Sequence, residues 1–237
     1  MRSEVRTEAT TTESGLGHNN RLKSNHDASR VSDPGSLTTD LSPPTSTSPM
    51  RIVFLGPPGA GKGTQAQRLK SYLSVAHLST GEMLRDSADT ALGRKAAHFM
   101  GAGQLVPDDV VVGIVVERLA DDDCENGCLF DGFPRTVPQA QALDRMLTEH
   151  GMPLDLVLAL DVPETDLIAR LSARGRPDDN LEAIAERFRQ YHALTKPLME
   201  YYNRRGILRQ IDASASPEKV FDRIQSAVDA TVSSNSP

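Results

Sequence analysis

Three features that define large classes of proteins are scarce in this sequence: cysteine, long apolar runs and net positive charge. Cys124 and Cys128 are its only cysteines, and two thiols without a second pair of ligands are typical of inert cysteines in a reducing cytosol. No apolar stretch is long enough to span a bilayer, and the formal net charge of -6 argues against a nucleic-acid binder with a general basic surface. We therefore expect a cytoplasmic protein without membrane or nucleic-acid partners.

Apolar periodicity is also missing from residues 1–49, which are rich in Ser, Thr, Pro and Asn. Such a segment cannot bury enough apolar surface to offset the entropy lost on ordering, so we predict a disordered extension. Its acidic residues argue against a transit peptide. Met50 lies directly before the first strand-like run and is a candidate for the natural start, in which case residues 1–49 are not native. The folded domain is expected over residues 50–237.

From residue 51 onward, short apolar runs alternate with amphipathic segments of helical period. Continuous apolar runs suit strands buried on both faces, as in a parallel sheet covered by helices. The alternation therefore predicts a doubly wound α/β fold that binds ligands at the carboxyl ends of its strands. Strands are predicted at 51–55, 75–79, 128–131, 154–162 and 207–212, and helices at 108–120, 137–150, 164–173, 180–204 and about 217–231.

The predicted helix at 180–204 has the clearest period. Its apolar residues recur on one side, from Leu181 through Phe188 to Leu198. Asp179 is the predicted N-cap residue, with an acidic residue three places later as in a capping box. Pro197 is expected to kink the second half of this helix.

Residues 56–64 read GPPGAGKGT and follow the first predicted strand. This is the setting of a phosphate-binding loop (P-loop), in which glycines let backbone N–H groups face phosphate oxygens and a lysine reaches the β- and γ-phosphates. Asp131, at the end of the third predicted strand, resembles the aspartate that orients magnesium or its water in phosphoryl transfer. ATP is expected at Gly59, Ala60, Gly61, Lys62, Gly63 and Thr64.

Five motifs in order resemble those of adenylate kinases, a branch of the nucleoside monophosphate kinases: GPPGAGKGT (56–64), STGEMLR (79–85), DGFPR (131–135), GRPDDN (175–180) and RFRQYH (187–192). The resemblance implies reversible transfer of the terminal phosphoryl group of ATP to AMP, giving two ADP and serving adenine nucleotide balance and energy homeostasis. It also implies a monomer with a five-stranded parallel sheet, helices on both of its faces, an AMP-binding segment at 79–108 and a short lid at 173–179.

The resemblance assigns a role to individual residues as well. Gln139 corresponds to the family's adenine reader, and Ala215 to a position whose backbone lies near the ATP adenine. Arg174 corresponds to an ATP-side arginine. The implied catalytic residues are Lys62, Arg135, Arg174, Arg176 and Arg187. AMP is expected at Thr80, Arg85, Gln104, Leu105, Val106, Gly132, Phe133, Pro134, Arg135, Gln139, Arg176 and Arg187.

This set also suits the chemistry. The acceptor oxygen of AMP is already deprotonated, so phosphoryl transfer chiefly needs alignment and positive charge around the moving group. A guanidinium group supplies both, whereas an ammonium group supplies only charge. This need for charge and alignment explains why an acidic chain would gather these arginines and Lys62 at one site. A single arginine is more often a solvated surface charge, and it is the placement in the family motifs that favours the functional interpretation.

Two departures from common patterns bear on metal ions. Gly63 stands where a phosphate-binding loop usually carries a hydroxyl, and Thr64 comes one place late. We therefore expect Mg²⁺ to be held mainly by the phosphates of ATP and by water, with Asp131 acting through water. The lid has only Gly175 between Arg174 and Arg176, where long-lid relatives insert about thirty residues, so no structural zinc is expected.

Three alternatives stay open at this point. A kinase for UMP or CMP tends to carry Ala at the position of Thr80, so Thr80 and Gln139 favour adenine. A GTP:AMP phosphotransferase is not excluded, because the loop reads phosphates and the donor base is held partly by backbone. The third alternative is a nucleotide-binding regulator without transferase activity. Binding alone would not require positive charge on both sides of the transferring phosphate, so the full set of arginines disfavours it.

Overall fold

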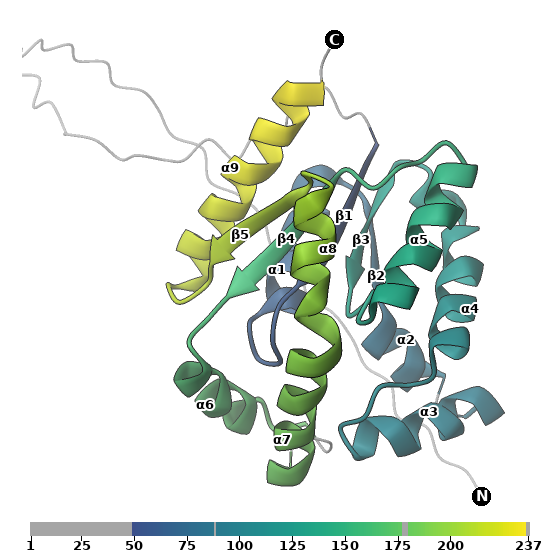
Figure 1. Cartoon of the computed structure of the whole chain (residues 1–237), viewed down its shortest axis with the longest axis vertical. Coiled ribbons are helices and arrows are strands. Elements are labelled where there is room, and N and C mark those ends of the chain that lie inside the picture. Colours follow the sequence, from purple (N-terminus) through teal and green to yellow (C-terminus); the bar gives the residue numbers. More distant parts are fainter. Residues whose placement is uncertain (1–48, 88, 177–179, 236–237) are drawn as a thin grey trace, which may run out of the picture. The chain divides into compact units, whose positions relative to one another are not determined.

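Five parallel strands form the centre of the computed structural model, which describes residues 49–87, 89–176 and 180–235 (Figure 1). The strands lie in the order β2-β3-β1-β4-β5. The predicted doubly wound α/β fold is therefore confirmed, and each predicted strand overlaps its observed counterpart. The strands are β1 (Met50–Leu55), β2 (Ala76–Ser79), β3 (Gly127–Asp131), β4 (Leu156–Asp161) and β5 (Leu208–Asp212).

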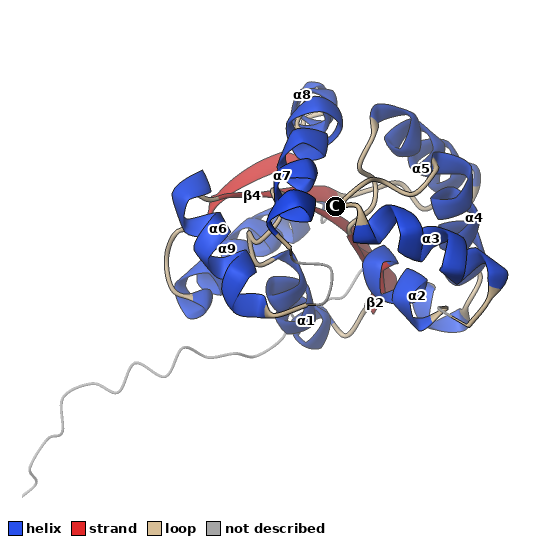
Figure 2. Ribbon diagram, turned by 90° about the horizontal axis from the view of Figure 1, so that it is seen from below, coloured by secondary structure: helices blue, strands red, loops and turns tan. Residues whose placement is uncertain are grey.

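Helices cover both faces of the sheet because side chains of a strand alternate between its faces. Ile52 and Phe54 of β1 belong to the same apolar cluster as residues of α1 and α9, whereas Val53 and Leu55 cluster with residues of α5 and α8. Figure 2 shows these two pairs of helices on opposite sides of the sheet. The helices are α1 (Lys62–Leu73), α2 (Thr80–Asp86), α3 (Ala91–Gly101), α4 (Asp108–Leu119), α5 (Val137–Glu149), α6 (Glu164–Arg174), α7 (Leu181–Gln190), α8 (Pro197–Arg204) and α9 (Pro217–Asn235).

The middle of the sheet contains the point at which the chain changes direction. β1 and β4 are neighbours, yet the chain leaves β1 toward β2 at one edge and leaves β4 toward β5 at the other. In open α/β sheets, ligands bind in the crevice that such diverging connections leave at the carboxyl ends of the strands. The loop after β1 lies in this crevice, where a Cβ atom on Gly56 would be 2.9 Å from the carbonyl oxygen of Leu160 in β4.

The predicted single helix over 180–204 is wrong in its central part. A π-helical segment, Tyr191–Thr195, separates α7 from α8. Pro197 has no N–H to donate to the preceding turn, and the backbone N–H of Lys196 donates to the carbonyl of Tyr191, five residues back, at 2.8 Å. The expected kink at Pro197 therefore takes the form of a widened turn.

The N-cap of α7 also differs from the prediction. The side chain of Asn180 accepts a hydrogen bond from the backbone N–H of Ala183 at 2.8 Å, so Asn180 is the cap residue. Asp179, the predicted cap, lies outside the described residues. The same holds for residues 1–48 of the predicted extension and for 177–179 of the predicted lid. Within the described part of the chain, no helix combines the length and apolar character needed to cross a membrane.

Candidate active site

A cleft of about 790 Å³ opens at the carboxyl ends of the strands. Its walls come from the loops after β1, β3 and β5, from the 79–106 segment, and from α6 and α7. Phe133 is the exception among the predicted site residues, because its ring is 0% exposed and packs in the core. The predicted residues that line the cleft are Gly59, Ala60, Gly61, Lys62, Gly63, Thr64, Thr80, Arg85, Gln104, Leu105, Val106, Asp131, Gly132, Pro134, Arg135, Gln139, Arg174, Arg176, Arg187 and Ala215.

The loop after β1 wraps around the side chain of Lys62. Its ammonium Nζ donates to the carbonyl oxygens of Gly56 and Pro57 at 2.8 and 2.9 Å. Gly61 precedes α1 in the left-handed region, with φ of 90°, and brings no side chain to the first backbone N–H groups of the helix. These N–H groups and the positive end of the helix dipole face the space in which Lys62 lies, a setting that suits phosphate.

The pKa of Lys62 lies much closer to neutral pH than that of an ordinary lysine. The pKa of Lys62 is lowered from 10.5 to about 8, chiefly by burial; Asp131 opposes this shift, and the nearby cations Arg135 and Arg174 add to it. Asp131 ends β3, Arg135 lies in the loop after it and Arg174 ends α6, so these two parts of the chain converge on the loop after β1 in the cleft. Positive groups are thus gathered in spite of the net negative charge of the chain.

Asp131 lies directly opposite Gly63. A Cβ atom on Gly63 would be 3.3 Å from Oδ2 of Asp131, so the missing side chain keeps the space before this carboxylate open. Burial alone would raise the pKa of Asp131, but His77 and the charges of Lys62 and Arg135 outweigh burial and lower it. Asp131 is therefore ionised at neutral pH.

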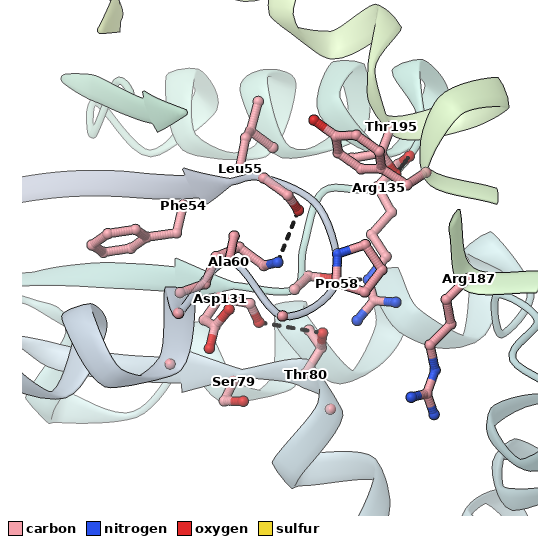
Figure 3. A pocket seen from close by; sticks show the side chains of 18 of the residues that line it. Phe54, Leu55, Pro58, Ala60, Ser79, Thr80, Asp131, Arg135, Arg187 and Thr195 are labelled. Carbon is pink, nitrogen blue, oxygen red and sulfur yellow. Dashed lines mark hydrogen bonds between the residues drawn. The ribbon is translucent and has the colours of Figure 1, made fainter. Parts of the chain in front are cut away.

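The opposite wall of the cleft carries the predicted AMP residues. The hydroxyl of Thr80 donates to the carbonyl of Asp131 at 3.5 Å, which ties the start of α2 to the end of β3. The guanidinium of Arg85 lies 3.5 Å from the Cβ position of Gly81. Figure 3 shows Thr80 and Asp131 close together and Arg135 and Arg187 entering the same pocket from different elements.

Arg135 is held at several points of its backbone and side chain. Its Nε donates to the carbonyl of Gly132 at 2.7 Å, and its own carbonyl accepts from the hydroxyl of Thr195 at 2.9 Å. Thr195 belongs to the π-helical segment, so that irregular turn fixes the arginine. Desolvation by the walls of the cleft lowers the pKa of Arg135. The charge of Asp131 raises this pKa, and the charges of Arg187 and Arg85 lower it. The guanidinium groups of three separate segments therefore meet here.

Sequence reasoning missed several residues on the side of the cleft near Ala215. Gln65 is 3% exposed, and its Nε2 donates to the carbonyl of Pro217 at 3.0 Å. Arg170 reaches the carbonyl of Ala213 at 3.4 Å through both terminal nitrogens. Arg170 lies one helical turn before Arg174 on α6, and this spacing is the signal that would have found it. Gln65 offered no such signal, because its partner is 152 residues away.

His77 is a further residue without a predicted role. Its side chain is 3% exposed, and its Nε2 lies 3.7 Å from Oδ2 of Asp131, beyond a direct hydrogen bond. Its Nδ1 pairs with Nε2 of Gln67 at 3.1 Å. Because an amide N–H donates, Nδ1 accepts and Nε2 carries the proton, which points toward Asp131.

The two cysteines lie away from the cleft. Both are free thiols. Burial raises the pKa of Cys124 to about 11 and that of Cys128 to about 12, so both stay protonated at neutral pH. Protonated, buried thiols do not ligate metal ions well, which agrees with their interpretation as inert cysteines.

Comparison with known proteins identifies the family. The adenylate kinase family model matches residues 54–207, which is most of the described domain. Adenylate kinases from Nitrobacter hamburgensis, Leptospira biflexa and Thermodesulfovibrio yellowstonii are 50%, 47% and 44% identical to this chain. The alignments cover 72%, 75% and 74% of this chain and 88%, 99% and 97% of the respective relatives. The chain belongs to the adenylate kinase family.

Family membership confirms the predicted reaction. Adenylate kinases transfer the terminal phosphoryl group of ATP to AMP, and the chain is an ATP:AMP phosphotransferase acting on ATP, AMP and ADP. The family uses Mg²⁺ together with ATP. Neither the kinases for other monophosphates nor a regulator without activity is favoured by these comparisons. The adenylate kinase fold places its phosphate-binding loop at the crevice between β1 and β4, where the described cleft lies.

Proposed function

We propose that the cleft binds both nucleotides at once, with their phosphates meeting at Lys62. ATP lies with its phosphates along Gly59 to Thr64 and its adenine near Ala215. AMP lies on the opposite wall, in the 79–108 segment and against Gln139. The observation that carries this proposal is the position of Lys62: the loop that holds its Nζ and the 79–106 segment line one and the same cleft, and Asp131 lies next to this loop, 3.3 Å from the Cβ position of Gly63. Lys62 therefore lies between the two walls, where the phosphoryl group must pass.

The reaction then needs no general base. An oxygen of the AMP phosphate attacks the γ-phosphorus of ATP, a new P–O bond forms, and the bond to the β–γ bridging oxygen breaks with its electron pair leaving on ADP. Both products are ADP. Negative charge grows on the equatorial and bridging oxygens, and Lys62, Arg135 and Arg187 are placed to stabilise it. Arg174 and Arg176 line the same cleft and would contribute from the 173–179 lid.

Magnesium fits this site through Asp131. Mg²⁺ neutralises charge on the β- and γ-phosphates when it accompanies ATP. Asp131 is ionised, and the open space above Gly63 leaves room for a water between the carboxylate and the ion, whereas no hydroxyl is available at that position. We propose that Asp131 orients a water of the ion's shell rather than binding the ion directly.

Several wider properties complete the proposal. The donor is ATP in preference to GTP, and the acceptor is AMP. Two free thiols suit the reducing cytoplasm. All proposed catalytic side chains come from one chain, which is consistent with a monomer.

A coupled assay of ADP formation tests the proposed substrates. ATP is offered with AMP, CMP, UMP or GMP, and GTP is then offered with AMP. We expect turnover with ATP and AMP to exceed every other pair by at least about tenfold, since a site that pairs with one base leaves polar groups unpaired with another. Faster turnover with another monophosphate would overturn the acceptor assignment, and binding without any turnover would indicate a regulator.

A further inference from the structure

Gln139 does not lie loosely in the cleft, because protein groups hold both ends of its amide. The side chain is 2% exposed. Its Oε1 accepts a hydrogen bond from the backbone N–H of Arg135 at 2.7 Å, and its Nε2 donates to Oδ1 of Asp108 at 2.6 Å. Asp108 is the first residue of α4, 31 positions before Gln139 in the chain, and none of the five sequence motifs includes it.

These two partners leave one orientation for the amide. A backbone N–H only donates, so it selects Oε1, and a carboxylate only accepts, so it selects Nε2. The carboxylate is itself held, because its other oxygen, Oδ2, accepts from the hydroxyl of Thr136 at 2.9 Å. A flipped Gln139 would set its NH₂ against an N–H and its carbonyl oxygen against a carboxylate. Both contacts would then be repulsive.

We propose that Asp108 is the positioning residue that sets base selectivity in the AMP site, by fixing which way the amide of Gln139 points. The inference rests on the proposed role of Gln139 as adenine reader. An amide has one further acceptor site on its oxygen and one further N–H, and a Gln pairs with adenine through the 6-amino group and a neighbouring ring nitrogen. With its orientation fixed, Oε1 of Gln139 can accept a hydrogen bond from the 6-amino group of adenine.

The same fixed orientation rejects a base with oxygen at position 6. Hypoxanthine, the base of IMP, differs from adenine by a 6-carbonyl oxygen in place of the amine, so Oε1 of Gln139 would face another acceptor. Guanine has the same 6-oxygen. Rotation of the amide by 180° would present N–H to that oxygen, and the contacts to Asp108 and to the backbone N–H of Arg135 both oppose this rotation. Discrimination at position 6 therefore depends on a residue that touches the reader and need not touch the base.

The experiment compares kcat/KM for AMP and for IMP in Asp108→Asn, Gln139→Leu and Asp109→Asn. Asn at position 108 is isosteric and can donate as well as accept, so it removes one of the two contacts that oppose rotation of the amide and leaves only the backbone N–H of Arg135. Asp109 is the matched control, since it is also acidic, lies in the same first turn of α4 and is exposed. Removing it changes the charge at the helix N-terminus equally. Thermal denaturation of each variant reports any loss of stability.

We expect the ratio of kcat/KM for AMP to that for IMP to fall by about tenfold or more in Asp108→Asn, the scale of one lost charge-assisted hydrogen bond. Asp109→Asn should keep the ratio of the unaltered protein. A lower kcat/KM for both nucleotides with an unchanged ratio would show a merely structural role and overturn the inference. If Gln139→Leu also left the ratio unchanged, the adenine-reader assignment itself would be wrong. A collapsed ratio in Gln139→Leu alone would refute only the role of Asp108.

Discussion

Raising the pH should impair the use of ATP well below the pH at which an ordinary lysine titrates. Burial and neighbouring cations lower the pKa of Lys62 from 10.5 to about 8. Only the ammonium form brings positive charge to the phosphates. In the free enzyme, about nine in ten Lys62 side chains are therefore charged at pH 7 and about one in ten at pH 9. A lysine of ordinary pKa would still be almost fully charged at pH 9.

The quantity to measure is kcat/KM for ATP with AMP held far below its own KM, because this ratio then reports the ionisation of the free enzyme. It should fall about tenfold between pH 7 and pH 9, with an apparent pKa near the value of about 8 given above. The phosphates of both nucleotides are already about nine-tenths ionised at pH 7, since their second pKa is about 6, so their titration adds little change in this range. Bound phosphate favours the charged lysine, so kcat at saturation should fall only at higher pH.

Folding stability should move in the opposite direction. The pKa of Lys62 is lower in the folded chain than in the unfolded chain, so between about 8 and 10.5 the unfolded chain binds a proton that the folded chain has lost. This contribution to the free energy of unfolding therefore rises with pH over that window. Lys62→Arg is the control, because its guanidinium stays charged and its profile should be flat from a lower starting rate. An unaltered protein with constant kcat/KM for ATP from pH 7 to about 9.5 would refute the reasoning.

Three substitutions outside the catalytic set test the packing of the fold. Gly103→Ala should lower the free energy of unfolding by about 2 kcal/mol or more, because Gly103 has φ of 72° and a Cβ atom there would be 2.4 Å from the carbonyl oxygen of Ala183. Gly101→Ala, where a Cβ atom meets nothing within 4 Å, should leave the midpoint of thermal denaturation unchanged or raise it, and equal losses in both variants would contradict this account. Tyr202→Phe should raise the free energy of unfolding by about 1 kcal/mol with unchanged turnover, because the buried hydroxyl of Tyr202 has no hydrogen-bond partner among the described residues. A lower midpoint of chemical denaturation would show that this hydroxyl is in fact stabilising.

Local patterns were sufficient to predict the strands of this fold. Residues 52–55 are continuously apolar because β1 is buried on both faces, and that cause acts within the run itself. The interruption at 191–195 was not predictable in the same way. Pro197 indicates that one backbone hydrogen bond of the helix is missing. Whether the helix then bends, ends or widens depends on what packs against it. Here the widened turn brings the hydroxyl of Thr195 to the carbonyl of Arg135.

The residues of the candidate site also differ in whether local sequence was sufficient to predict them. The phosphate-binding loop was predictable because glycines, lysine and helix start are consecutive in the chain. Asp108 was not, because its partner Gln139 is brought to it only when α4 and α5 pack together. Phe133 shows the converse case, since it stands inside a motif of predicted site residues while its side chain belongs to the core. Motifs thus locate a segment of the backbone more reliably than they assign each side chain in it.

The account rests most heavily on Arg135 as a group that stabilises the transferring phosphoryl. The direct test is the rate of ADP formation by Arg135→Ala with both ATP and AMP saturating, after titration has established that each nucleotide still binds. Loss of transition-state charge stabilisation should lower kcat by about 10³-fold or more. A kcat within about tenfold of the unaltered protein would contradict the account, because Arg135 would then serve only to bind AMP.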